Sequence, residues 1–319
     1  MKRLFNISIA LFMTAVAPAT LAADNRPIEL VVPFATGGST DVYARLLAKE
    51  LGAELKQPVI VVNKPGAGGG LAASAVGHAA PDGKTILLGT ISTHAINPWL
   101  YKSLPYDPNK DFVPVAKVVA MPNVLAVRAN SDIKSVDDLV NKAKSTDLTF
   151  GSAGGGTTSH LAGELMKQIK PELKLTHVPY RGSAPAVTDL LGGHTTFQFD
   201  NLTSLLSHIQ AGRLRALAVS SLKPSEQLPG VKPLDAQGFK GFELESWFAI
   251  FLPRGASAAT VTQYSDALKK VYEKPELLKQ IQGAGITPSL VYGPEFEKFL
   301  QSEQTKWRDL LRKADIKLD

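Results

Sequence analysis

Residues 28–62, IELVVPFATGGSTDVYARLLAKELGAELKQPVIVV, contain a strand, a glycine turn, a helix and a second strand in succession. The first run, 28–34, is rich in β-formers and is followed by a glycine turn at 35–41. Apolar residues at helical spacing after the turn predict one helix, and they are Val42, Leu46, Leu47, Leu51 and Leu55. The closing run, 59–62, is apolar throughout, as a parallel strand buried on both faces would be. The stretch therefore predicts a βαβ unit and an α/β fold.

Helix and strand patterns alternate through the rest of the chain in two series. The first series ends near residue 122. The second begins with a strand predicted at 124–127 and ends with a helix predicted at 202–210 and a strand predicted at 214–219. After a stretch with several Pro and Gly residues, an apolar strand at 246–252 precedes three C-terminal helices, which need a sheet to pack against. We therefore expect the chain to cross twice between two α/β lobes, each a mainly parallel sheet flanked by helices. The predicted lobes are 24–122 plus 245–319 (lobe 1) and 123–244 (lobe 2).

The N-terminal segment, 1–22, has the composition of a secretory signal peptide. Lys2 and Arg3 precede an apolar run, and small residues then lead to a cleavage site predicted near Ala22 and Ala23. The apolar run is well short of the roughly 20 residues that span a bilayer, which argues against a membrane anchor. We therefore expect an exported, periplasmic protein. Because the chain has no cysteine, its exported form must fold without disulfides.

Three glycine turns, at 35–41, 63–70 and 151–157, each follow a predicted strand and precede a predicted helix. In open α/β sheets, ligands bind beyond the carboxyl ends of the strands, where helix N-termini offer free N–H groups to anions. Ser and Thr residues accompany the glycines in the first and third turns. These hydroxyls either bind a solute or cap their own helices. Their recurrence in both lobes favours a site between the lobes.

Motifs for catalysis, cofactors and nucleic acids are incomplete. Thr157 follows Gly156 where a phosphate-binding loop needs lysine, and Leu71 stands where a dinucleotide fingerprint needs its third glycine. The chain has no G-x-S-x-G elbow, and its six dispersed histidines lack zinc-type spacing. The net charge of +6 is spread along the chain rather than clustered. We therefore expect no enzyme activity, cofactor, metal or nucleic-acid partner.

Two polar residues after predicted strands of the second series have alternative roles. Arg181 either pairs with a carboxylate through both arms of its guanidinium, or is a surface arginine bonded to loop carbonyls. Asp200 is expected where the sheet of lobe 2 meets the cleft. It either accepts a hydrogen bond from a hydroxyl or ammonium group, or caps the helix that begins at Leu202.

Several blocks together resemble one family, the extracytoplasmic receptors of tripartite tricarboxylate transporters, also called Bug receptors. The first block is Pro33-Phe34-x-x-Gly37-Gly38-x-x-Asp41-x-x-Ala44-Arg45. Later blocks follow in order: Asn63-Lys-Pro-Gly-Ala-Gly-Gly69, Pro81-Asp-Gly83, Tyr180-Arg-Gly-Ser-Ala-Pro185, Asp189-Leu-Leu-Gly-Gly193 and Phe199-Asp-Asn201. The resemblance extends over essentially the whole chain after the signal peptide.

The resemblance implies a periplasmic binding protein of the type II-like "Venus flytrap" kind. Such a receptor captures a small carboxylate-containing solute between its lobes and delivers it to membrane permease subunits, and we expect it to be a monomer. In lobe 1 the resemblance implies ligand contacts from Phe34, Gly37, Gly38, Thr40, Asp41, Gly68, Gly69, Ser92, Thr93 and His94. In lobe 2 it implies contacts from Ser152, Gly155, Thr157, Thr158, Ser159 and Asp200.

The chain departs from the family pattern at two places. The glycines at 68–70 are not followed by the asparagine that many relatives carry, and Thr195 and Thr196 stand where relatives often have other residues. Both departures bear on the solute, whose class stays open among dicarboxylates, tricarboxylates, aromatic acids, amino acids and neutral compounds. Two other functions also stay open: a ligand sensor of a signalling system, and an exported enzyme with Asp200 or His160 as base.

Overall fold

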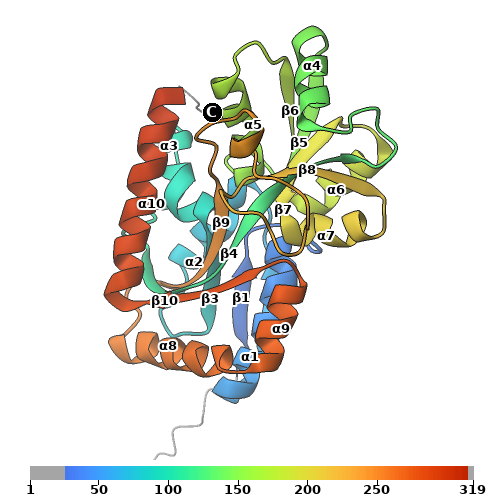
Figure 1. Ribbon diagram of the computed structural model, residues 1–319. Helices are drawn as coiled ribbons and strands as arrows, with labels where there is room; N and C mark the ends of the chain where they lie inside the picture. Colours follow the sequence, from blue (N-terminus) through green and yellow to red (C-terminus); the bar gives the residue numbers. More distant parts are fainter. Residues whose placement is uncertain (1–25, 315–319) are drawn as a thin grey trace, which may run out of the picture.

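The computed structural model describes residues 26–314, so the predicted signal peptide lies outside the described residues. Strands and helices alternate in two groups (Figure 1). The strands are β1 (Ile28–Val32), β2 (Val59–Asn63), β3 (Thr85–Thr90), β4 (Phe112–Arg128), β5 (Leu148–Ser152), β6 (Leu175–Pro179), β7 (Phe197–Asn201), β8 (Leu214–Val219), β9 (Glu245–Pro253) and β10 (Thr287–Tyr292). The helices are α1 (Ser39–Leu55), α2 (Gly70–Gly77), α3 (Asn97–Leu100), α4 (Val136–Ser145), α5 (Thr158–Ile169), α6 (Ser183–Gly192), α7 (Leu202–Gln210), α8 (Ala258–Tyr272), α9 (Pro275–Gly283) and α10 (Gly293–Ala314).

The first sheet has the strand order β2-β1-β3-β9-β4-β10. Strand β1 is parallel to β2 and β3, whereas β9 is antiparallel to β3 and β4, and β10 is antiparallel to β4. Helices α1, α8 and α9 bury one face of this sheet, and α2 and α10 bury the other. Figure 1 shows α10, in red, along the side of this lobe.

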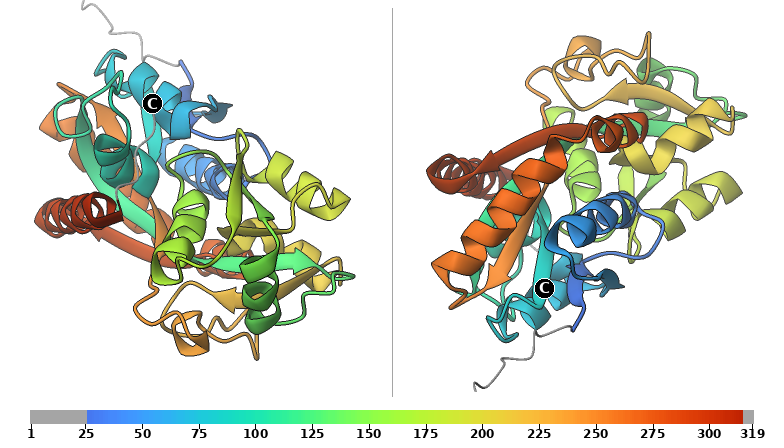
Figure 2. Two further views of the ribbon diagram at one scale, coloured as in Figure 1. Left: turned by 90° about the horizontal axis from the view of Figure 1, so that it is seen from above. Right: turned by 90° about the horizontal axis from the view of Figure 1, so that it is seen from below.

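The second sheet has the order β6-β5-β7-β4-β8. Strand β5 is parallel to β6 and β7, and β4 is antiparallel to β7 and β8. Helices α4 and α5 pack on one face and α6 and α7 on the other. Figure 2 shows these green and yellow elements gathered on one side of the molecule, beside the lobe built from both ends of the chain.

Strand β4 belongs to both sheets. Its residues up to Pro122 pair with β9, and its residues from Asn123 pair with β7 and β8. The return to lobe 1 follows β8 and enters β9 at Glu245. Near the crossing, the Asn123 N–H donates to Ser220 Oγ at 2.8 Å, so the outgoing and returning segments are hydrogen-bonded to each other. We propose these two crossings as the lobe boundaries.

The predicted two-lobed α/β class is confirmed, but the prediction of mainly parallel sheets is wrong. Both sheets are mixed, because β4 and β9 run antiparallel to their neighbours where they connect the lobes. Strand β10 was not predicted, and β4 is much longer than the strand predicted at 124–127. Within residues 26–314, no helix is long and apolar enough to cross a membrane.

Candidate functional site

An inner cavity lies between the lobes, where β1, β3, β5 and β7 reach their carboxyl ends. The N-termini of α1 and α5 and the start of β9 complete its walls. It encloses about 30 Å³, room for about one or two water molecules. Its lining is almost entirely hydroxyl, amide and aromatic: Phe34, Ser39, Thr40, Thr90, Ile91, Ser92, Ala153, Thr157, Thr158, Ser159, Ser183, Asp200, Asn201, Ser246 and Phe248.

An outer pocket of about 440 Å³ adjoins the inner cavity and shares Phe34 and Ala153 with it. Lobe 1 contributes the glycine loop before α2 and the Tyr101 side chain. Lobe 2 contributes the turn after β5 and the residues that follow β6. The remaining lining residues are Pro65, Gly66, Ala67, Gly68, Gly69, Leu71, Gly154, Gly155, Pro179, Tyr180 and Arg181.

Helix α1 presents free donors at the inner cavity. Gly38 is its N-cap, and the backbone N–H groups of Thr40 and Asp41 have no hydrogen-bond partner among the described residues. The Thr40 hydroxyl lines the cavity and likewise has no partner within residues 26–314. The N-terminus of a 17-residue helix also carries partial positive charge. This corner of the cavity is therefore suited to an anion.

Helix α5 approaches the same cavity from lobe 2. Thr157 caps the helix by accepting from the His160 N–H, and its hydroxyl also bonds the Ser159 hydroxyl at 2.8 Å. Ser159 Oγ accepts from the Ala153 N–H at 2.9 Å, which fixes the turn. The N–H groups of Thr158 and Ser159 have no partner among the described residues. A second helix N-terminus therefore faces the cavity with free donors.

Two stacked histidines support the α5 turn from behind. The rings of His160 and His177 lie 4.1 Å apart, and His177 Nε2 lies 2.6 Å from Ser152 Oγ. His160 Nδ1 accepts from the Gly156 N–H at 3.3 Å. Burial lowers the pKa of His160 to about 3 and that of His177 to about 4, so both rings are neutral at ordinary pH. Their contacts give them a structural role in shaping the turn.

Asp200 is a buried carboxylate at the end of β7. Its Oδ1 accepts from Ser183 Oγ and from the Asn201 N–H, each at 2.8 Å, and its Oδ2 accepts from Gln198 Nε2 at 2.6 Å. Burial raises the pKa of Asp200 to about 6, against the lowering effect of these hydrogen bonds. The carboxylate therefore organises the polar wall of lobe 2 and holds the Ser183 hydroxyl at the cavity.

Several hydrogen bonds join the lobes across the cleft. At the floor, Asn201 Nδ2 donates to Ser39 Oγ at 2.8 Å, and the Ser39 N–H donates to Ser204 Oγ at 3.2 Å. Others are Thr158 Oγ1 with Ser246 Oγ at 2.8 Å, Tyr101 Oη to the Gly155 carbonyl at 3.1 Å, and the Ala35 N–H to the Arg181 carbonyl at 3.3 Å. The two lobes are thus in direct contact around the cavity.

Comparison with known proteins identifies the family. Residues 43–316 match the family described as tripartite tricarboxylate transporter family receptor. The chain belongs to this family. The periplasmic binding protein BugD is 32% identical, with a TM-score of 0.87 over 92% of this chain and 98% of BugD. The receptor therefore shares the Bug-type periplasmic binding protein fold.

Two similar structures contain bound acids. The Rpa4515 protein of R. palustris, solved with adipate, is 32% identical, with a TM-score of 0.89 over 93% of the receptor and 99% of that protein. MatC from Rhodopseudomonas palustris, solved with bound malate, is 31% identical, with a TM-score of 0.83 over 90% of the receptor and 99% of MatC. The receptor therefore belongs to a group of solute-binding proteins.

The predicted ligand contacts fall into three groups: those that line the inner cavity, those that line only the outer pocket, and those that line neither. Those at the inner cavity are Phe34, Thr40, Ser92, Thr157, Thr158, Ser159 and Asp200. Gly68, Gly69 and Gly155 line only the outer pocket. Gly37, Gly38, Asp41, Thr93, His94 and Ser152 line neither of these hollows.

Several of this last group are bonded within their own lobe. Asp41 accepts from the Gly37 N–H and from Arg45, both at 3.0 Å. Burial alone would raise the pKa of Asp41, but the hydrogen bonds from Arg45 and Gly37 outweigh it and leave that pKa lowered. His94 is fully buried, bonded to Thr93 and stacked on Phe251 with ring centroids 3.6 Å apart.

Five polar wall residues were not among the predicted contacts: Ser39, Thr90, Ser183, Asn201 and Ser246. Ser183 and Asn201 lie inside two of the family blocks, so the sequence resemblance could have indicated them as ligand contacts. Thr90 Oγ1 and Asn201 Oδ1 are buried without a hydrogen-bond partner among the described residues. Since buried polar groups normally have hydrogen-bond partners, we expect a bound solute or a water molecule to supply the partner of these two atoms.

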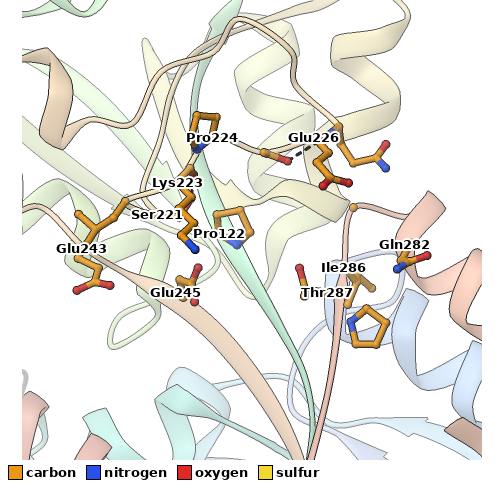
Figure 3. Close-up of a pocket in the computed structure, with 15 residues that line it drawn as sticks. Pro122, Ser221, Lys223, Pro224, Glu226, Glu243, Glu245, Gln282, Ile286 and Thr287 are labelled. Atoms are coloured by element: carbon orange, nitrogen blue, oxygen red, sulfur yellow. Dashed lines mark hydrogen bonds between the residues drawn. The ribbon is translucent and has the colours of Figure 1, made fainter.

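A separate hollow of about 690 Å³ lies beside the crossing between the lobes (Figure 3). It is lined by Pro122, by the loop after β8 and by the start of β10, and it includes Glu226, Glu243 and Glu245. It shares no lining residue with the inner cavity or the outer pocket. Among the described residues, no group of three or more His, Cys, Asp or Glu side chains is arranged to hold a metal ion.

Proposed function

We propose that the receptor captures a small carboxylate-containing solute in the periplasm and delivers it, unchanged, to the permease subunits of a tripartite tricarboxylate-type transporter. The observation that carries this proposal is the start of α1, where Thr40 lines the inner cavity and neither its backbone N–H nor its hydroxyl has a partner among the described residues. An oxyanion is the ligand that such donors bind. The adipate and malate in the two similar structures support this solute class.

Capture requires the lobes to separate and close again. The inner cavity has room for about one or two water molecules, far less than a dicarboxylic acid needs. A solute therefore enters an open cleft, and the cross-lobe hydrogen bonds form as lobe 2 closes on it. Because a ligand shifts an equilibrium only through differential affinity, contacts present only in the closed form must favour closure. Thr158–Ser246 and Ser39–Asn201 are two such contacts.

The test is calorimetric titration of the purified protein against a panel of carboxylic acids, with small-angle scattering of the free and saturated forms. We expect at least one acid to bind and the radius of gyration to fall on binding. Chromatography of the recovered ligand should return it chemically unchanged. Binding without contraction would sink the closure mechanism, and a panel without a binder would refute the assignment of a carboxylate-containing solute.

Delivery needs its own measurement. Membrane vesicles that contain a tripartite tricarboxylate-type permease should accumulate the labelled acid only when loaded receptor is added. Equal uptake with and without the receptor would refute delivery while leaving solute binding intact.

A further inference from the structure

The two adjoining hollows differ greatly in size. The outer pocket, at about 440 Å³, falls in the range of small-molecule sites, whereas the inner cavity is more than tenfold smaller. Phe34 and Ala153 line both, so a solute that reaches the start of α1 passes these residues and extends outward. The outer pocket therefore has the room for most of the solute.

The two hollows also differ in charge. Asp200 is the one charged side chain in the lining of the inner cavity, and Arg181 is the one charged side chain in the lining of the outer pocket. A second carboxylate on the solute would be repelled near Asp200 and attracted near Arg181. The outer pocket further exposes Leu71, which is 53% accessible, as apolar surface for a hydrocarbon body.

The backbone around Arg181 is held against lobe 1. Its carbonyl accepts from the Ala35 N–H at 3.3 Å, next to Phe34. Gly182 has φ +149°, and a Cβ added there would lie 2.9 Å from the Ala35 nitrogen, so glycine permits the close approach. The Arg181 side chain itself is exposed and has no hydrogen bond or ion pair among the described residues. The backbone thus places an arginine, whose guanidinium has no partner among the described residues, at the outer pocket.

We propose that Arg181 is a specificity-determining residue, which selects solutes with a second carboxylate by binding that group in the outer pocket while the first carboxylate lies at the N-terminus of α1. This inference rests on the proposed function and adds to it the residue that distinguishes a dicarboxylate from a monocarboxylate. Guanidinium suits a carboxylate because it donates two parallel hydrogen bonds. The methylene chain between the two ends lies against Phe34 and Leu71.

The experiment compares acids that differ only in the second carboxylate. Succinate, adipate and suberate are titrated calorimetrically, each beside the monocarboxylate of the same chain length, into wild type, Arg181→Gln, Arg181→Lys and Arg254→Gln. Arg254 is an exposed arginine just beyond the far end of β9, so Arg254→Gln makes the same charge change away from the cleft. Thr40→Ala serves as the reference for the inner carboxylate.

We expect the wild type to prefer the dicarboxylate in at least one pair. Arg181→Gln should reduce this preference by about three- to tenfold, and Arg181→Lys should reduce it less. Arg254→Gln should leave the preference as in the wild type, and Thr40→Ala should weaken both members of the pair. A preference that Arg181→Gln and Arg254→Gln leave equally intact would overturn the role of Arg181 while the proposed function stands. Failure of every acid to bind the wild type would overturn both.

Discussion

Ser204→Ala tests whether cross-lobe contacts set the affinity of the receptor. Ser204 lines neither the inner cavity nor the outer pocket, so its side chain does not contact a solute bound there. Its Oγ accepts from the Ser39 N–H of lobe 1 at 3.2 Å and also bonds the Asp200 carboxylate within lobe 2. The first of these bonds exists only when the lobes are closed, and the second is present in either form.

The size of the effect follows from that difference. Loss of the bond to Asp200 costs stability in the open and the closed form alike, so it cancels from the closing equilibrium. Loss of the bond to Ser39 costs the closed form alone about 0.5–1.5 kcal/mol, the net value of one hydrogen bond. The dissociation constant of a bound carboxylic acid should therefore rise about two- to tenfold.

The assay is calorimetric titration of Ser204→Ala beside Ser207→Ala. Ser207 lies on the same helix, is exposed, and its hydroxyl has no hydrogen bond among residues 26–314, so it is a matched serine deletion. Urea unfolding without ligand measures the loss of the bond to Asp200 separately. Equal dissociation constants for the two variants would refute the argument that the Ser39–Ser204 bond favours closure.

Three further changes have defined outcomes. Thr40→Ala should weaken carboxylate binding by about 1–2 kcal/mol in calorimetry, because its hydroxyl faces the inner cavity without another partner; unchanged affinity would remove Thr40 from the site. Because the pKa of Asp200 is raised to about 6 in the folded protein, its neutral form predominates below that pH and repels an anion less, so affinity should rise as the pH falls through about 6. The same raised pKa means that the protein should lose stability as the pH rises through about 6, because the buried carboxyl must then ionise. Asp200→Asn should flatten the pH profile of affinity in calorimetric titrations and that of stability in urea unfolding. Gly163→Ala would place a Cβ 2.3 Å from the Phe150 ring and should lower the free energy of unfolding by about 1–3 kcal/mol, whereas Gly283→Ala, with nothing within 4 Å, should not.

Elements with a clear local pattern could be predicted from the sequence. The predicted bounds of α7, 202–210, and of β8, 214–219, agree with the structure. In α7, leucines at helical spacing face the sheet, and β8 is apolar except for Arg215. Where one face or both faces of an element are buried, its hydrophobic period is visible in the sequence.

Strand β10 and the first part of β4 lack such a local pattern. Strand β10 contains Pro288, is partly exposed and forms one edge of the sheet, where proline is tolerated. In β4 the pairing with β9 shifts between Pro114 and Ala116 and again between Lys117 and Val119. Such irregularities interrupt the alternation of inward and outward side chains. These two elements are specified by their pairing partners more than by their own residues.

The candidate site divides in a similar way. The glycine turns and strand ends that surround the cavity are local features, and the sequence places Thr40 and 157–159 at them. The hydrogen-bond partner of each polar group depends on the fold, and the sequence could not indicate it. Asp41 is bonded to Arg45 on its own helix, whereas Ser246 meets Thr158 across the cleft.

The inner cavity offers a solute carboxylate N–H and O–H donors but no cationic side chain. A buried ion pair would carry a desolvation cost of several kcal/mol per charge, and its rupture would have to accompany every opening of the lobes. Helix N-termini supply partial positive charge without that cost, because their N–H groups have no partner in the helix itself. Opening then breaks single cross-lobe hydrogen bonds of about 1 kcal/mol each, of which Ser39–Asn201 and Thr158–Ser246 are examples. A receptor that must release its solute is better served by several such weak contacts than by one strong charge. An exposed arginine such as Arg181 adds selectivity at the rim of the site, where solvent screens its attraction for the solute.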